Sequence, residues 1–249
     1  MSNYVYTITA DRSDYSMFKK MLESLNKHCK FCLLLNTTET SKEIIDFSKN
    51  ILGDNLRIKN IDKSKWSGKR MLYKIENILS YQFEKDDNVF ILDDDLIIQD
   101  DIFKVFSNNF DVCITSRHYK YWYVINGGVW GFKYNEKSKE FLKYYISQIY
   151  NPTWFPLVMF RSKFARNKSF DWWVDQDFLC VVKENGVPIN NCKVLDIGYK
   201  YNFCPSVEEN IPQTYELAKS EILKVVGNQE YKILHFKGRL KNIIKEVDL

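Results

Sequence analysis

Long apolar runs are missing from this sequence, which bears first on its relation to membranes. No window approaches the roughly 18 uncharged apolar residues that a spanning helix needs. The opening residues, MSNYVYTITADRSD, also lack the basic segment and apolar run of a secretory signal. From these two absences we expect a cytoplasmic protein without a transmembrane segment.

An excess of charge of one sign is missing as well. The 36 Lys and Arg residues and 32 Asp and Glu residues leave a formal net charge of +4, and no block of like charge stands out. Nucleic-acid-binding proteins usually carry a strong basic patch, and a balance this mild makes nucleic acid an unlikely main partner. We therefore expect no nucleic-acid partner.

Cysteine is present without a pattern that would give it a function. Of the six cysteines, only Cys29 and Cys32 have a motif spacing, and they enter the apolar run FCLLL instead of opening a helix as a redox pair does. No second ligand pair with zinc-site spacing accompanies them. Scattered reduced thiols are the prediction.

What the sequence does contain is a regular alternation of strand and helix patterns. Such alternation predicts an α/β fold, with a central, mostly parallel sheet whose two faces are covered by helices. No repeat or low-complexity linker interrupts the chain, so we expect a single domain over residues 1–249. The strand patterns cover 4–10, 30–37, 55–61, 88–94 and 110–116, and helical patterns cover 13–29, 41–52 and 67–83.

The most informative segment is NVFILDDDLIIQDD, residues 88–101, where three carboxylates end an apolar strand. In open α/β sheets, ligands bind beyond the carboxyl ends of the strands. Asp93 and Asp95 share one side of an extended chain and Asp94 points away. Two carboxylates on one side favour a hard cation, Mn²⁺ or Mg²⁺. The alternative is an acidic helix N-terminus, although Asp100 and Asp101 suit that purpose better.

The strand ending in FILDDDLII resembles the DxD signature of GT-A-type glycosyltransferases, which transfer a sugar from a nucleotide sugar. Three further segments resemble the glycogenin-like and galactosyltransferase-like (family 8-like) branch, in the same order. INGGVWGF, residues 125–132, is similar to its N-x-G-V element, WWVDQDFL, residues 172–179, to its DQD element, and ILHFKGRLK, residues 233–241, to its H-x-x-G-x-x-K element. The chain departs from that branch in lacking a Pro-Trp after the last element and in placing Asp between the two acids.

The resemblance implies a GT-A (Rossmann-like) fold and a metal centre. Asp93, Asp95 and His235 would hold the metal. The residues expected to contact the nucleotide sugar are Asp94, Asn126, Gly127, Gly128, Gly238 and Lys241, with Lys237 or Arg239 adding positive charge. Residues 1–110 would form the nucleotide-binding half and residues 111–249 the half for the donor sugar and acceptor. Read without the resemblance, the Gly pair is a turn between strands and His235 a structural histidine.

The DQD element bears on stereochemistry. If the transfer inverts the anomeric centre, Asp175 or Asp177 would be the general base. If it retains the configuration, which the DQD and HFKG segments favour slightly, Gln176 or its neighbours would support the oxocarbenium-like species. Asp175 could equally cap a helix that begins there.

Two further pairs are weaker candidates for donor contacts. Lys69 and Arg70 begin the helix before the acidic strand, where they would face phosphates or lie on a solvated helix face. Asp11 and Arg12 follow the first strand, where this fold holds the nucleotide base, although a helix cap explains them as well. The aromatic and basic segment 150–173 suits sugar stacking and a phosphorylated acceptor or anionic membrane surface, or it simply packs on the domain.

The sequence thus predicts a metal-dependent glycosyltransferase with a nucleoside diphosphate sugar donor, with uridine as the expected base, and a glycan or other hydroxyl acceptor. A sugar-phosphate nucleotidyltransferase is a second interpretation, but TADRSDY lacks the glycine-rich loop that such enzymes place after the first strand. A carbohydrate-binding relative without activity is the third, and the full set of Asp93, Asp95 and His235 disfavours it.

Overall fold

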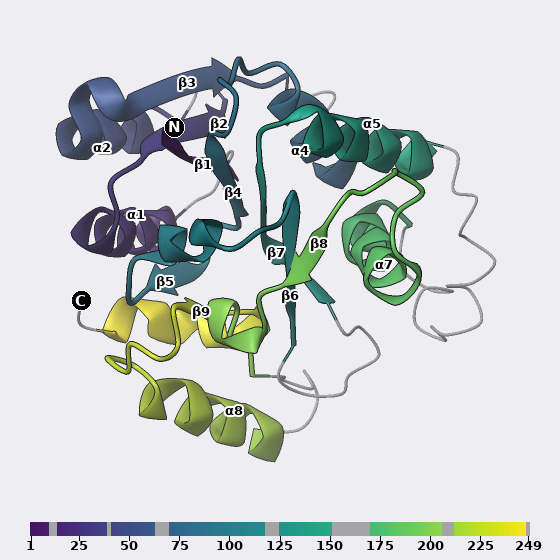
Figure 1. The fold of residues 1–249 in the computed structure, drawn as a ribbon. Coiled ribbons are helices and arrows are strands. Elements are labelled where there is room, and N and C mark those ends of the chain that lie inside the picture. Colours follow the sequence, from purple (N-terminus) through teal and green to yellow (C-terminus); the bar gives the residue numbers. More distant parts are fainter. Residues whose placement is uncertain are drawn as a thin grey trace.

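The structure, a computed structural model, describes residues 1–9, 14–38, 41–62, 70–117, 125–150, 170–205 and 212–247 (Figure 1). The strands are β1 Asn3–Ile8, β2 Cys32–Thr37, β3 Leu56–Asn60, β4 Asn88–Leu92, β5 Leu96–Ile98, β6 Val112–Ser116, β7 Ile125–Lys133, β8 Val194–Asp196 and β9 Ile233–His235. The α-helices are α1 Ser16–His28, α2 Lys42–Leu52, α4 Arg70–Ile78, α5 Glu136–Tyr150, α7 Phe170–Asn185 and α8 Pro212–Lys224. Short 3₁₀ helices are η1 Gly53–Asn55, η2 Ile102–Ser107, η3 Tyr199–Tyr201 and η4 Gly238–Glu246.

Seven strands form the central sheet in the order β3-β2-β1-β4-β7-β6-β8. The pairings β3–β2, β2–β1, β1–β4 and β6–β8 are parallel, whereas β7 runs antiparallel to both of its neighbours. The mostly parallel α/β sheet predicted from the sequence is therefore confirmed. After β1 the chain builds β2 and β3 on one side and then returns to place β4 on the other. This reversal is a topological switch point at the carboxyl ends of β1 and β4, the place where open α/β sheets bind ligands.

Helices cover both faces of the sheet because the buried strands are apolar on both sides. Tyr4 and Tyr6 of β1 pack into the apolar cluster that α4, α5 and α7 cover, and Val5 packs into the opposite cluster under α1 and α2. Figure 1 shows these two groups of helices on opposite sides of the strands. The alternation of side chains along β1 thus fixes which layer each helix joins.

A second, two-stranded sheet pairs β5 with β9 in antiparallel orientation. Its side chains alternate between two clusters: Ile98 pairs with Ile233 on the side of the main core, and Ile97 pairs with Leu234 in a smaller core under α8 and η4. This small core attaches the C-terminal part of the chain to the segment that follows the acidic triplet. It is the feature that positions the candidate site.

The structure tests several local predictions about helix ends and cysteines. The helical pattern over 67–83 extends too far, because α4 ends at Ile78 and the next residue, Leu79, is 39% exposed. Asp101 is the N-cap of η2, accepting from the Phe103 N–H at 3.0 Å, so the acidic helix start lies after the triplet. All six cysteines are free thiols, as predicted. Of the helices that the structure describes, none has the length and apolarity to cross a membrane.

Candidate metal centre at the end of strand β4

The acidic triplet lies in the short connection between β4 and β5. The last ladder pair of β4 joins Leu92 to Val129 of β7, and the Asp93 N–H then donates to the Gly128 carbonyl at 2.8 Å. β5 begins immediately after Asp95. Strands thus hold the triplet at both ends, beside the topological switch point of the sheet.

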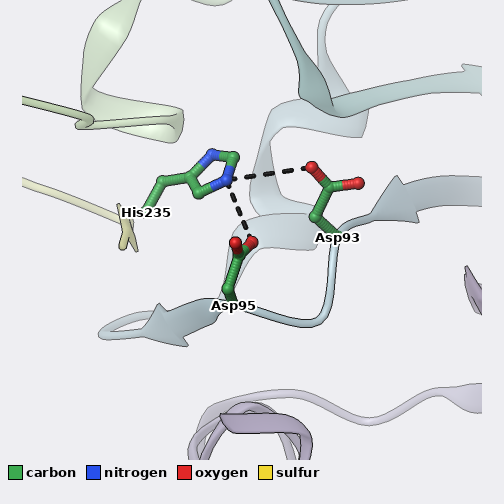
Figure 2. Close-up of side chains that lie close together, drawn as sticks. All are labelled: Asp93, Asp95 and His235. Atoms are coloured by element: carbon green, nitrogen blue, oxygen red, sulfur yellow. Dashed lines mark ion pairs between the residues drawn. The ribbon is translucent and has the colours of Figure 1, made fainter. Parts of the chain in front are cut away.

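His235 reaches the triplet through the pairing of β5 with β9. Leu96 lies opposite His235 in the register, and the Phe236 N–H donates to the Asp95 carbonyl at 2.9 Å. The His235 N–H in turn donates to the Phe203 carbonyl at 2.9 Å. Backbone hydrogen bonds on both sides of β9 therefore place the imidazole beside Asp93 and Asp95, as Figure 2 shows.

One nitrogen of the imidazole points at both carboxylates. His235 Nε2 lies 3.0 Å from Asp95 Oδ1 and 3.8 Å from Asp93 Oδ2 (Figure 2). Candidate ligand atoms of the three residues all lie within 4.8 Å of one another. Among the described residues, Asp95 Oδ1 and His235 Nε2 are buried without a hydrogen-bond partner, although they face each other. An unsatisfied buried polar atom costs about 1–3 kcal/mol, and a cation between the two would satisfy both.

Each carboxylate also has its own lysine. Lys74 Nζ of α4 lies 2.8 Å from Asp93 Oδ1, and Lys241 Nζ of η4 lies 2.6 Å from Asp95 Oδ2. Lys237 Nζ donates to Asn126 Oδ1 at 2.8 Å. Three ammonium groups therefore gather around the acidic triplet, and such a cluster of cations suits an anionic ligand.

Burial and neighbouring charges together determine the pKa values of the site. For the two acids the neighbouring charges outweigh burial, and for the imidazole burial outweighs the neighbouring charges. Burial alone would raise the pKa of Asp93, but the Lys74 ammonium and neighbouring cations outweigh it and hold that pKa at about 2. The same balance, with His235 and Lys241 as partners, lowers the pKa of Asp95 despite its burial. Burial lowers the pKa of His235 below 6.5 although carboxylates lie beside it. At neutral pH the site therefore offers two carboxylates and a neutral imidazole, the forms that bind a metal.

Gly128 leaves the room that this arrangement needs. A Cβ at that position would lie 2.3 Å from His235 Cε1 and 2.5 Å from Asp93 Oδ2. Asn126 supports the same corner, because its Oδ1 accepts from the Gly128 N–H at 3.1 Å and from Lys237. Gly127 and Gly128 both lie inside strand β7. They do not form the turn between strands that is expected when the resemblance is left aside.

The structure brings together most of the residues predicted for this end of the sheet. Asp93, Asp95, Asn126, Gly128, His235 and Lys241 surround one centre. Gly127 lies beside them in β7, and Asp94 is buried between the two ligand acids. Gly238 begins η4 with a φ of +56°, a conformation that glycine adopts without strain.

Other predicted residues lie outside the described residues, or their side chains do. Asp11, Arg12 and Lys69 fall outside the described residues. Arg70 begins α4, but its side chain is outside the description, as are the side chains of Asp175 and Asp177. The backbone does settle one alternative: α7 begins at Phe170, so Asp175 is not a helix N-cap.

Gln176 is the member of the DQD segment whose side chain the structure describes. It is buried, and its Oε1 accepts from Arg117 Nη2 at 2.9 Å. Arg117 directly follows β6, so this contact joins α7 to the strand beside β7. The carbonyl oxygen of Gln176 is thus turned toward the arginine.

Sequence reasoning missed two residues next to the candidate ligands. Lys74 is 5% exposed and pairs with Asp93, whereas the sequence pointed to Lys69 and Arg70. The sequence does contain one indication of Lys74: it lies on the apolar face of α4, beside Ile75 and four residues before Ile78. Asn202 Oδ1 lies 2.8 Å from His235 Nδ1, and no local pattern marks it.

Comparison with known proteins supports the fold. No protein-family model matches the sequence, and no curated protein matches it significantly. Among solved structures, the galactosyltransferase LgtC, in complex with donor and acceptor sugar analogues, is similar with a TM-score of 0.59 at 12% identity, over 99% of this chain and 96% of LgtC.

Two other glycosyltransferases show the same likeness. GlyE of Streptococcus pneumoniae TIGR4 matches with a TM-score of 0.62 at 15% identity, over 98% of this chain and 59% of GlyE. Mouse xyloside xylosyltransferase 1 matches with a TM-score of 0.54 at 12% identity, over 95% of this chain and 98% of the enzyme. The chain therefore has the GT-A fold that the sequence predicted.

Proposed function

We propose that this protein is a metal-dependent glycosyltransferase that moves a sugar from a nucleoside diphosphate sugar, with uridine as the base, to a hydroxyl group of a glycan or other acceptor. One observation carries the proposal. Two buried polar atoms, Asp95 Oδ1 and His235 Nε2, lie 3.0 Å apart beside Asp93 at the carboxyl end of β4, and neither has a hydrogen-bond partner among the described residues. A cation explains that arrangement, and a stable apolar core does not require it.

The donor set suits Mn²⁺, with Mg²⁺ as the second choice. Two carboxylates and an imidazole combine hard oxygen ligands with a nitrogen ligand, whereas Mg²⁺ prefers oxygen and water throughout. Asp93, Asp95 and His235 would hold the ion. When bound, such an ion acts as a Lewis acid that neutralises negative charge on a departing nucleoside diphosphate.

The lysines supply the second half of the electrostatic support. Lys74, Lys237 and Lys241 each place an ammonium group within 2.8 Å of an oxygen of the site. In the metal-free protein the first and last of these neutralise the carboxylates. Phosphate oxygens of a donor are the anionic partners that this cluster of cations favours.

Retention of the anomeric configuration is the proposed stereochemical outcome, on the resemblance of the DQD and HFKG segments. Inversion is the rival, with Asp175 or Asp177 of α7 as the general base. The two outcomes differ in the anomeric configuration of the product. Proton NMR of the glycoside, whose anomeric centre is configurationally stable, distinguishes them by the coupling of the anomeric proton.

A thermal-shift panel tests the donor and the metal together. Nucleoside diphosphate sugars of different bases are added with Mn²⁺ or with EDTA. A ligand at 100 times its Kd stabilises the native state by about 2.7 kcal/mol, which raises the Tm of a domain of this size by about 5–10 °C. We expect this shift for UDP-sugars with Mn²⁺ and its loss with EDTA.

Variants locate the effect. Asp95→Asn and His235→Gln should lose the metal-dependent shift, while Asp54→Asn, an exposed acid on η1, should keep it. Equal shifts in all variants would refute the assigned metal ligands. Release of pyrophosphate from an NTP and a sugar phosphate would instead identify a nucleotidyltransferase, and donor binding without any hydrolysis or transfer would identify a carbohydrate-binding protein.

A further inference from the structure

We propose that Asn202 is a positioning residue that fixes the tautomer of His235, so that Nδ1 carries the ring proton and the Nε2 lone pair points at Asp93 and Asp95. The inference rests on the proposed metal centre and extends it to residues behind the imidazole. It follows from a chain of hydrogen bonds through β6, β7 and the residue that ends η3. Each bond in that chain has one permitted direction.

The chain begins at Thr115 on β6. Its Oγ1 lies 2.7 Å from the Val129 carbonyl oxygen, which can only accept, so the hydroxyl donates its single hydrogen there. The hydroxyl oxygen then remains as an acceptor. Asn202 Nδ2 lies 2.8 Å from it and donates to it.

The amide of Asn202 is therefore fixed in orientation. Its nitrogen faces two oxygens, Thr115 Oγ1 and, at 3.2 Å, the Asn126 carbonyl. Both contacts require the NH₂ group, which leaves Oδ1 on the other side, 2.8 Å from His235 Nδ1. An amide oxygen only accepts, so the hydrogen in this contact belongs to Nδ1.

A competing contact to the same ring nitrogen is weaker. Asn126 Nδ2 lies 3.1 Å from His235 Nδ1, and it would donate to that nitrogen in the opposite tautomer. That tautomer would bring two acceptors, Nδ1 and Asn202 Oδ1, within 2.8 Å of each other with no hydrogen between them. Within the described part of the chain, His235 Nδ1 is also the group that can donate a hydrogen bond to Asn202 Oδ1. The shorter contact decides the tautomer.

Burial makes this choice consequential. Thr115, Asn126, Asn202 and His235 are each 0% exposed, so bulk water does not compensate for a wrong orientation. With the proton on Nδ1, Nε2 presents a lone pair to two carboxylates, which repels them unless a cation lies between. Nε2 lies 3.0 Å from Asp95 Oδ1 and 3.8 Å from Asp93 Oδ2, so a cation held between these atoms would relieve the repulsion.

The tautomer can be observed directly in the metal-free wild-type protein. The chain has three histidines, so selective ¹⁵N-histidine labelling gives a simple long-range ¹H–¹⁵N spectrum. The signals of His235 are assigned by their loss in His235→Gln. We expect its Nδ1 to be protonated and Nε2 to be the bare nitrogen. A spectrum with the proton on Nε2 would overturn the inference, whether or not the protein binds a metal.

Variants then test the effect on metal binding, read by Mn²⁺ titration with electron paramagnetic resonance. Removing an outer partner of a metal-binding histidine typically weakens binding 10- to 100-fold, and we expect a loss in this range for Asn202→Leu. Thr115→Val removes one of the two acceptors that orient the Asn202 amide, so it should give a smaller loss and a mixed tautomer. This variant also keeps the test available if Asn202→Leu fails to fold.

A matched control removes a buried amide elsewhere. Asn88 is 5% exposed, starts β4 and lies about 16 Å along the strand from Asp93. Asn88→Leu should leave both the tautomer and the Mn²⁺ affinity unchanged. Equal affinity in the wild type, Asn202→Leu and Thr115→Val would overturn the inference while leaving the proposed function intact. Absence of Mn²⁺ binding by the wild type would instead overturn the proposed function, and the spectrum would still decide the tautomer.

Discussion

The Asp95 carboxylate has two oxygens, and each faces a different partner. Oδ1 lies 3.0 Å from the His235 imidazole, and Oδ2 lies 2.6 Å from Lys241. The side chain is nearly buried, so its charge is stable only with these partners around it. Asp93 repeats the arrangement with Lys74. At the scale of single residues, the proposed function implies that a cation and a diphosphate would complete this set of charges.

Gly128→Ala tests the packing of this site without removing a ligand. The new methyl group would lie 2.3 Å from His235 Cε1 and 2.5 Å from Asp93 Oδ2, so one of the two must move. We expect Mn²⁺ affinity to fall by at least tenfold and stability by about 1–3 kcal/mol, the usual cost of overpacking. Calorimetric Mn²⁺ titration and urea unfolding measure the two effects.

Gly186→Ala is the control for that substitution. Its Cβ would meet nothing within 4 Å, but the residue has a φ of +73°. Alanine there should therefore cost about 1 kcal/mol through backbone strain and leave Mn²⁺ binding unchanged. If Gly128→Ala binds Mn²⁺ as tightly as this control, the packing assigned to the site is wrong.

Residues of the site divide into those the sequence could identify and those it could not. Asp93, Asp95 and His235 stand in motifs whose spacing carries information, and they meet as expected. Lys74 and Asn202 stand in no motif, and only the folded chain brings them to Asp93 and His235. A buried polar network is determined by three-dimensional contacts that a single sequence does not display.

At the scale of elements, the site depends on how firmly β9 is held against β5. Gln99, which follows β5, carries much of that attachment. Its Nε2 donates to the carbonyls of Val225, Asn228 and Tyr231 at 3.1, 3.2 and 2.8 Å, and its Oε1 accepts from the Gly227 N–H at 2.6 Å. One buried side chain thus fixes the loop that leads from α8 into β9.

Gln99→Leu should loosen that loop and the histidine that follows it. Leaving buried backbone groups unsatisfied costs about 2–3 kcal/mol in unfolding free energy, which urea denaturation measures. Because β9 positions His235, we also expect weaker Mn²⁺ binding. Asn88→Leu, which removes a buried amide far from β9, should lose stability alone. A Gln99→Leu protein with unchanged Mn²⁺ affinity would show that the loop does not position the imidazole.

The same pair of strands carries a pH-dependent contact. Asp100, after β5, accepts from Lys232, just before β9, and this hydrogen bond is the main reason that its pKa is lowered from 3.8 to about 2. A carboxyl group with a lowered native pKa stabilises the fold above pH 4, and that contribution disappears as the pH falls toward 2.

Asp100→Asn should therefore be less stable than the wild type at pH 7, and the difference should shrink between pH 4 and pH 2. Urea unfolding across this range measures it, with Asp54→Asn as a control on an exposed acid. A difference that stays constant, or grows, as the pH falls would contradict the assigned ion pair.

Some helices and strands could be predicted from the sequence, and others could not. The strands β1, β2 and β4 and the helices α1 and α2 have clear apolar patterns, and they lie where expected. Strands β5, β8 and β9 have three residues each, too few to show a period, and their pairing is decided by the cores on either side of them. Gly128 lies inside strand β7, where a Cβ atom would collide with Asp93 and His235. The sequence alone does not reveal this close approach.

At the scale of the whole molecule, the centre is assembled from distant parts of the chain. The two acids come from the β4–β5 connection, Gly128 from β7, and His235 and Lys241 from the C-terminal part that α8 and β9 attach to the sheet. The division into a nucleotide-binding half, residues 1–110, and a donor-sugar and acceptor half, residues 111–249, stays a prediction. The ligands of the centre come from both halves.

The most direct test of the central claim is a crystal structure with Mn²⁺ and UDP, measured at a wavelength where manganese scatters anomalously. We predict one strong anomalous peak within bonding distance of Asp93, Asp95 and His235 Nε2, with phosphate oxygens of UDP beside it. A peak elsewhere, or UDP bound at the end of β4 without any manganese between these three side chains, would contradict it.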